Sequence, residues 1–392
     1  MQKNKLFFSS KNLKVALIVT TGRSGSDYLN CCLDGLNGLM SFCGKFNYHQ
    51  FFLQKNSKIN KLILINKFLK KYGSLFSYNK IENINTKINI KKFKSNFLKI
   101  TSNSKIDRKE FLINLYVAYH LTLNKNFRNI KYLIHHSHGI NETINVLQDF
   151  PNSKLLITIR QPLANLKSGI NNWFSYDKRR ISVAHTFTYI YRIRQDLKYL
   201  ITLKNKKLFV KLEEANLLKV KKNICKFLSI KLQKNIYKAT LAGKVWHGDR
   251  LSRVKSKKGE YLSSTNNNKW ENYFSKKEIT LLSFIYNDYQ KFGYKLKNLK
   301  FFEKIKCFVT IFSLFSFEKK AFQNNNLLKS LVNVKVWRNK KEITKKIKLE
   351  KLETSSDFKE EKKNIKYLIF RIIYFILIFL KLDYLLKNKH LS

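Results

Sequence analysis

Two short segments combine the pattern of a buried strand with residues that bind phosphate. Val15 to Val19 is an apolar run that leads into the small, polar turn Thr20 to Ser26, and Leu155 to Ile159 is a second apolar run that leads to Arg160. Apolar runs without alternation predict parallel strands that are covered on both faces. Each turn is followed by a predicted helix, whose first N–H groups and dipole favour an anion. The two segments together predict a protein that holds a nucleotide by both of its phosphate ends.

The first turn contains several kinds of phosphate ligand. Gly22 and Gly25 permit backbone angles that other residues avoid, and Arg23 adds a planar positive charge. Hydroxyl donors complete a predicted phosphate site made of Thr21, Gly22, Arg23, Ser24, Gly25, Ser26 and Asp27. An ordinary strand-to-helix turn with a capping serine is the alternative. The pattern G-x-x-x-x-G-K-[ST] is absent, which argues against a kinase or an ATPase.

The second turn has different chemistry. Arg160 stands at the carboxyl end of the predicted strand, and Pro162 fits the first turn of a helix, where a missing N–H costs nothing. Ser168 lies about two turns along that helix. Both side chains converge on one phosphate if the turn folds the arginine back over the helix. A surface ion pair is the alternative for Arg160 taken alone.

These segments resemble the two nucleotide-binding elements of sulfotransferases. Thr21 to Leu29 resembles the loop for the 5′-phosphosulfate, in the bacterial and carbohydrate-type form with Arg in place of Lys. Phe150 to Ser168 resembles the element in which an Arg and a Ser eight apart hold the adenosine 3′-phosphate. Weaker matches at Lys211 to Ile230, at Trp270 and at Glu278 to Tyr294 follow in the family's order. The resemblance covers roughly residues 13 to 296.

The resemblance implies an α/β fold with a mainly parallel sheet, helices on both faces and a P-loop-like sulfotransferase architecture. It implies transfer of a sulfonate from 3′-phosphoadenosine-5′-phosphosulfate (PAPS) to a hydroxyl or amine of a glycan, a lipid-linked sugar or a small metabolite. The family's basic, glycine-containing loop is matched by Lys257, Lys258 and Gly259, further from Trp270 than the family places it. No metal is expected, because Arg23, the helix N-terminus and a hydroxyl meet the phosphate charge. A phosphate-loop kinase or other nucleotide-binding enzyme, and a non-catalytic protein that binds polyanions or membranes, are the alternatives.

Sulfuryl transfer needs a base for the acceptor proton, and histidines are the leading candidates. A short strand predicted at Tyr132 to Ile134 places His135, His136 and His138 at its carboxyl end, where open α/β sheets bind their ligands. The segment resembles the Lys-Thr-His element of cytosolic sulfotransferases, with His138 in place of the base and His136 in place of the lysine. His49 is the rival base, in a region where carbohydrate-type relatives often carry an acid and this chain has Lys45. A zinc site, without an accompanying cysteine or carboxylate cluster, and a solvated loop without a catalytic role are the remaining alternatives.

Charge and cysteine usage limit the remaining choices. The formal net charge of the 392 residues is +53, which favours anionic cofactors and acidic partners. The lysines are spread evenly, however, and no RNA-recognition signature or zinc finger is present, so nucleic acid is not expected. Five cysteines without a C-x-x-C pair are typical of a reducing compartment. With no signal peptide before the first strand, we expect a cytoplasmic enzyme of the bacterial type.

The composition changes near residue 296, which predicts a sulfotransferase domain at 13–296 and a basic, aromatic-rich helical extension at 297–392. Within the extension, the apolar run Tyr367 to Leu380 is interrupted by Arg371. As a helix it spans about 21 Å, short of the ~30 Å hydrocarbon core. We expect it to lie on the inner face of the cytoplasmic membrane, held by the surrounding lysines. The alternatives are a helix packed on the catalytic domain and a spanning helix, which requires the segment to run on to Leu386 past Lys381 and Asp383. Further helices are expected within 50–110, at 111–130 and at His185 to Leu203.

Overall fold

The structure is a computed structural model. It describes residues 13–54, 56–125, 127, 129–176, 183–248, 259, 270–319 and 353–382. The chain divides into two compact units, which are Met1–Arg160 with Leu200–Asn267, and Gln161–Tyr199 with Asn268–Ser392. In the described residues the first unit contains all the strands, and the second is helical. The domain boundary expected at residue 296 was placed where the sequence resemblance ends, and it stays a prediction.

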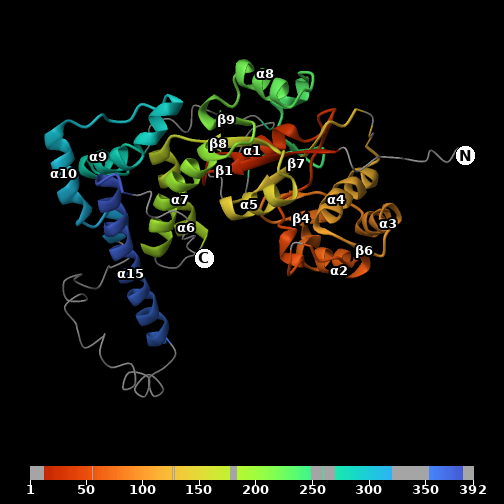
Figure 1. Cartoon of the computed structure of the whole chain (residues 1–392), viewed down its shortest axis with the longest axis horizontal. Coiled ribbons are helices and arrows are strands. Elements are labelled where there is room, and N and C mark those ends of the chain that lie inside the picture. The colour runs from red at the N-terminus through yellow and green to blue at the C-terminus, as the bar shows by residue number, and fades with distance from the viewer. Residues whose placement is uncertain are drawn as a thin grey trace, which may run out of the picture. The chain divides into compact units, whose positions relative to one another are not determined.

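A five-stranded sheet forms the centre of the first unit (Figure 1). Its order is β2 (Leu39–Met40), β7 (Tyr132–Ser137), β1 (Lys14–Thr20), β8 (Lys154–Ile159) and β9 (Lys207–Lys211), and every neighbouring pair is parallel. The residues of β7 and nearly all of those of β1 and β8 are buried, as their unalternating apolar sequences predict. The expected fold class, α/β with a parallel central sheet and flanking helices, is confirmed.

The chain between β2 and β7 forms the helices that were expected there. The helix expected over 111–130 is shorter: α4 begins after Asp107, whose side chain forms a capping box with Glu110, and ends at Thr122. Asn124 follows with φ +53°, which ends the helix. The other elements of this unit are α1 (Ser26–Leu33), η2 (His49–Phe51), β3 (Ile59–Asn60), α2 (Lys61–Tyr72), η3 (Gly73–Phe76), β4 (Tyr78–Asn79), β5 (Ile84–Asn85), α3 (Ile90–Ile100), β6 (Lys105–Ile106), α4 (Arg108–Thr122), α5 (Ile140–Asp149), η4 (Leu212–Glu214), α8 (Leu218–Phe227), η5 (Lys234–Tyr237), β10 (Thr240–Leu241) and β11 (Lys244–Val245).

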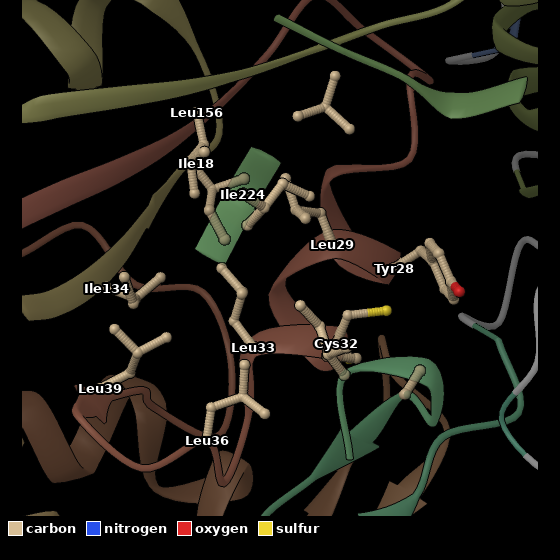
Figure 2. Packing of buried hydrophobic residues seen from close by; sticks show 14 of the residues in the cluster. Ile18, Tyr28, Leu29, Cys32, Leu33, Leu36, Leu39, Ile134, Leu156 and Ile224 are labelled. Atoms are coloured by element: carbon tan, nitrogen blue, oxygen red, sulfur yellow. The ribbon is translucent and has the colours of Figure 1, made fainter. Parts of the chain in front are cut away.

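Helix α1 is held against the sheet by a fully apolar contact (Figure 2). Leu29 and Leu33 of α1 are buried in one cluster with Ile18 and Leu156 from the sheet and Ile224 from α8. Burial of each such side chain stabilises the folded chain by roughly 1.5–3 kcal/mol. The cluster therefore fixes the start of α1, and with it the turn that joins β1 to α1. Cys31, Cys32 and Cys225 are buried in the same cluster as free thiols.

The described part of the second unit is helical. Its helices are α6 (Pro162–Tyr176), α7 (Val183–Thr202), α9 (Lys276–Ile285), η7 (Asn287–Phe292), α10 (Phe301–Ile311), α11 (Ser316–Lys319) and α15 (Glu353–Phe379). Pro162 opens α6, and α7 covers nearly the range expected for it, which confirms both predictions. Across the described ranges, no helix combines the length and the apolar character that crossing a bilayer requires.

Candidate active site

The turn between β1 and α1 has a backbone that requires glycine. Gly22 has φ +100° and Gly25 has φ +86°, both in the left-handed region. At Gly25 a Cβ atom would also collide with the side chain of Leu212, which follows β9. We call Thr20 to Ser26 the phosphate loop. Its conformation is set by the main chain and by close packing under it.

Hydroxyl groups of the phosphate loop bind the loop to the neighbouring strand. Ser24 Oγ is completely buried, 2.8 Å from Thr158 Oγ1 and 3.0 Å from Thr20 Oγ1. Thr21 Oγ1 donates to the Thr158 carbonyl at 3.2 Å. The Ser24 hydroxyl, predicted as a phosphate ligand, is thus already hydrogen-bonded within the protein. Ser24 would therefore bind an anion through its main-chain N–H.

The first turn of α1 has the features of an anion site. Gly25 is the N-cap and makes no side-chain cap hydrogen bond to the N–H groups that follow it. The helix dipole adds partial positive charge at the same place. Asp27 lies in this first turn, where its carboxylate would repel a phosphate. Its Oδ1 is 2.6 Å from Lys45 Nζ, so a cation offsets that charge.

The Asp27 carboxylate stays ionised although it is largely buried. Burial by itself would raise the pKa of the Asp27 carboxyl, but the Lys45 ammonium holds it well below its usual range. Lys45 Nζ is also 3.9 Å from Glu82, whose other oxygen accepts a hydrogen bond of 2.9 Å from Trp246 Nε1. In the sequence, Lys45 stands out only as a departure from the family pattern. Only the fold shows that it is the partner of Asp27.

Arg160 connects the second turn to the phosphate loop. Its Nη1 donates to the main-chain carbonyl of Arg23 at 3.3 Å. The strands that carry the two turns, β1 and β8, are neighbours and parallel, so both turns leave the same edge of the sheet. Ser168 lies in α6, which belongs to the second unit. The structure therefore brings together Arg23 and Arg160, which the sequence placed far apart.

The predicted glycine-containing loop is only partly described. Lys257 and Lys258 lie outside the described residues. Gly259 has φ +78°, and its carbonyl accepts a hydrogen bond of 3.0 Å from the Ala239 N–H, next to β10. Its role toward a 3′-phosphate stays a prediction.

Strand β7 is longer than the sequence indicated. It runs to Ser137, so His135 and His136 lie inside the strand, and only His138 follows it. The expectation that all three histidines follow the strand is wrong, because His135 packs among aromatic side chains as an apolar residue would. Its ring lies 5.3 Å from that of Phe46, and its Nδ1 is 3.1 Å from Tyr116 Oη. Burial lowers the pKa of His135 to about 3, so it is neutral at pH 7.

His136 faces the phosphate-loop side of the site. Its Nδ1 is 3.6 Å from Asp27 Oδ1, and its ring centroid is 6.3 Å from that of His138. Burial lowers the pKa of His136 well below its ordinary value, although the Asp27 carboxylate acts in the opposite direction. His136 is therefore a neutral, buried neighbour of Asp27, whereas His138 is exposed.

Glu142 is a carboxylate of this site that the sequence patterns did not predict. It lies in the first turn of α5, and its Oε2 accepts a hydrogen bond of 2.8 Å from the His138 N–H. Its Oε1 is 3.8 Å from His135 Nε2. Burial raises the pKa of Glu142 to about 7, although the His138 N–H and the Lys45 charge act in the opposite direction. The available signal was its position four residues after His138, which puts both residues at one helix start.

The rival base His49 belongs to a different network. Its Nε2 is 3.0 Å from Asp149 Oδ2, which also accepts a hydrogen bond from Tyr48 Oη. Asp149 Oδ1 accepts a hydrogen bond of 2.6 Å from Arg108 Nη2. Burial would raise the pKa of Asp149, but these hydrogen bonds lower it. His49 is buried in this network, which ties η2 to the end of α5 and to α4.

No group of three or more His, Cys, Asp and Glu side chains in the described part of the chain is arranged to hold a metal ion. The resident charges at this edge of the sheet come from side chains and from the start of α1.

No protein-family model and no curated protein matches the chain. Solved structures that match it include the sulfotransferase domain of the Synechococcus PCC 7002 olefin synthase, with 15% identity, TM-score 0.43, 72% of this chain covered and 96% of that chain. The sulfotransferase domain from the curacin biosynthetic pathway matches with 14% identity, TM-score 0.45, 73% of this chain covered and 100% of that chain. Sulfotransferase STF9 from Mycobacterium avium matches with 13% identity, TM-score 0.33, 57% of this chain covered and 66% of that chain. At these values the likeness concerns the fold alone.

Proposed function

We propose that the chain is a sulfotransferase that moves the sulfonate group of PAPS to a hydroxyl or amine of an acceptor. One observation carries this proposal: Arg160 reaches across from β8 and donates to the carbonyl of Arg23 in the phosphate loop. Two basic turns at the carboxyl edge of a parallel sheet, the first of them followed by a helix start with a glycine N-cap, suit an adenosine that bears phosphates at both ends.

The donor-binding roles follow from the charges at this edge. The first-turn N–H groups of α1 and Arg23 bind the 5′-phosphosulfate, and Arg160 binds the 3′-phosphate, with Ser168 as its expected partner. Lys45, held 2.6 Å from Asp27, offsets the charge of that carboxylate beside the phosphate loop. Arg23 and the start of α1 then stabilise the charge that grows on the leaving phosphate oxygen.

His138 serves as the general base in this proposal. It takes the proton from the acceptor hydroxyl or amine while the bond from the acceptor to sulfur forms. The bond between sulfur and the 5′-phosphate oxygen breaks, and its electron pair leaves with the nucleotide. Glu142 holds the His138 main chain at 2.8 Å and so positions the imidazole after the end of β7. Neutral His136 fills the space between His138 and Asp27.

Calorimetric titration with 3′,5′-adenosine bisphosphate, compared with 5′-AMP and with ATP plus magnesium, tests the donor assignment. We expect the bisphosphate to bind at least tenfold more tightly than 5′-AMP, since a charge-assisted hydrogen bond contributes roughly 1.5–3 kcal/mol. Arg160→Ala should remove most of that difference. Arg192→Ala, which removes an arginine that is paired with Asp196 on α7, is the control and should leave it intact.

Other outcomes would overturn the proposal. Equal binding of the three nucleotides, or binding that Arg160→Ala does not change, would indicate a non-specific polyanion site. A clear preference for ATP with magnesium would indicate a phosphate-loop kinase.

A further inference from the structure

Helix α10 presents its apolar side chains to solvent. Phe301, Phe302 and Val309 are 71%, 76% and 66% exposed. The exposed apolar stripe of α10 consists of Phe301, Phe302, Ile305, Phe308, Val309 and Phe312, whose spacing of three to four residues places them on one helix face. The opposite face, with Cys307 and Ile311, is buried. A helix of a globular protein ordinarily buries such a stripe, so this one is built to meet an apolar surface.

Helix α15 packs against α10 within the second unit (Figure 1). The ring of Phe308 lies 5.1 Å from that of Phe379, which joins the two helices. The exposed apolar residues of α15 and the turn after it are Ile369, Phe370, Ile373 and Leu380. In the rest of the described chain, exposed apolar side chains come singly or in pairs, as do Leu53 and the pair Leu217 and Leu218.

Arg371, which interrupts the apolar run in the sequence, does not interrupt the exposed face. It is completely buried, with its Nε 2.9 Å from Glu318 Oε1. It also donates to the carbonyls of Ile311 at 3.2 Å and Ser313 at 2.9 Å. These bonds attach one face of α15 to the end of α10. The exposed Ile369 and Ile373 lie on the opposite side of α15 from Arg371, at about 100° per residue.

Lysines border the exposed stripe. Lys304 and Lys306 are exposed and lie on opposite sides of the α10 stripe, at 100° per residue. Lys366 and Lys381 are exposed on the α15 side. The acidic residue of α10, Glu303, is paired with Lys297 at 2.6 Å. An apolar stripe between lysines suits the boundary of an anionic bilayer, where acyl chains meet the aromatic rings and headgroups meet the ammonium groups.

We propose that the second unit docks on the surface of a bilayer containing anionic lipids, through the exposed stripe of α10 and the exposed face of α15. Helix α10 is 11 residues long, or about 16 Å, so it lies in the interface and does not cross it. The inference stands on the second unit alone and does not depend on the proposed transfer reaction.

Flotation of the full chain with vesicles tests the docking. We expect binding to vesicles of phosphatidylcholine with phosphatidylglycerol, and much weaker binding to phosphatidylcholine alone. Phe301→Ser/Phe302→Ser/Val309→Ser should lower the partition coefficient about tenfold or more. Leu53→Ser/Leu217→Ser/Leu218→Ser, which removes three exposed apolar side chains of the first unit, is the matched control and should bind as the wild type does. Unchanged circular dichroism shows that both variants are folded.

Two double variants distinguish docking through the stripe from the non-specific attraction between anionic lipids and a chain of net charge +53. Lys304→Glu/Lys306→Glu should weaken vesicle binding far more than Lys91→Glu/Lys99→Glu, which changes two exposed lysines of α3. Equal losses from both pairs, or full binding by the triple stripe variant, would overturn the proposal. A third outcome would also overturn it: neither protein binds vesicles, and the wild type forms a dimer that the stripe variant does not form. The stripe would then contact a second copy of the chain.

Discussion

Glu142 makes the stability of the first unit depend on pH in a direction opposite to that of a paired carboxylate. Burial raises its pKa to about 7 in the folded chain, whereas the ordinary value is 4.5. Between these two values the folded chain keeps a proton that the unfolded chain releases. The stability that the protonated carboxyl contributes is therefore complete below pH 4.5 and is lost as the pH rises through 7.

The substitution Glu142→Gln removes this loss, because a neutral amide oxygen can still accept the hydrogen bond from the His138 N–H. The two pKa values differ by about 2.5 pH units, which at about 1.4 kcal/mol each corresponds to an upper limit of about 3 kcal/mol. The side chain is 13% exposed, so water reduces the effect. We expect the variant to be about 1–3 kcal/mol more stable than the wild type at about pH 8 and nearly equal to it below about pH 5.

Urea unfolding of both proteins across this pH range, followed by tryptophan fluorescence, measures the difference. Glu271→Gln, which replaces an exposed carboxyl, controls for the loss of one charge. Curves of wild type and Glu142→Gln that stay parallel from acid to alkaline pH would refute the argument, because they would show that the folded and unfolded chains bind the same number of protons at residue 142.

Three further predictions concern the phosphate loop and the base. Gly25→Ala should lower the free energy of unfolding by about 2–4 kcal/mol, because of backbone strain and the collision with Leu212. Gly35→Ala is the control: Gly35 has φ +73° but open space around it, so this substitution should cost only about 1 kcal/mol. Equal losses of stability in urea unfolding would show that the packing around Gly25 is unimportant. Asp27→Asn should destabilise the chain by about 1–3 kcal/mol at neutral pH. The difference in unfolding free energy between wild type and variant should narrow as the pH falls below 3.8, because the pKa of Asp27 is depressed in the folded chain. A difference that does not change with pH would argue against the pairing of Asp27 with Lys45. His138→Ala should reduce sulfonate transfer from PAPS by roughly 10²–10⁴-fold while the affinity for 3′,5′-adenosine bisphosphate stays unchanged. Unchanged transfer in His138→Ala, with loss in Glu142→Gln, would assign the base to the carboxylate.

Local sequence was sufficient to predict the elements that carry the site. The apolar runs before Thr21 and before Arg160 are strands because their residues can be covered on both faces, and the structure buries them in this way. Gly25 and Pro162 mark the starts of the two helices, since glycine permits the left-handed backbone of an N-cap and proline fixes the φ angle of a first helical turn. Such effects depend only on neighbouring residues, so they can be predicted without the fold.

The partners of these elements depend on contacts between distant residues, and only the tertiary structure decided them. The sheet order puts β1 between β7 and β8, which brings Arg160 to the Arg23 carbonyl and His136 to Asp27. The pKa of Glu142 is raised because the folded chain buries its carboxyl, which neighbouring residues in the sequence do not reveal. Arg371 looked like a polar break in an apolar helix, but the fold supplies Glu318 and two carbonyls for its guanidinium. Burial and charge pairing are properties of the packed chain, since they depend on which surfaces exclude water together.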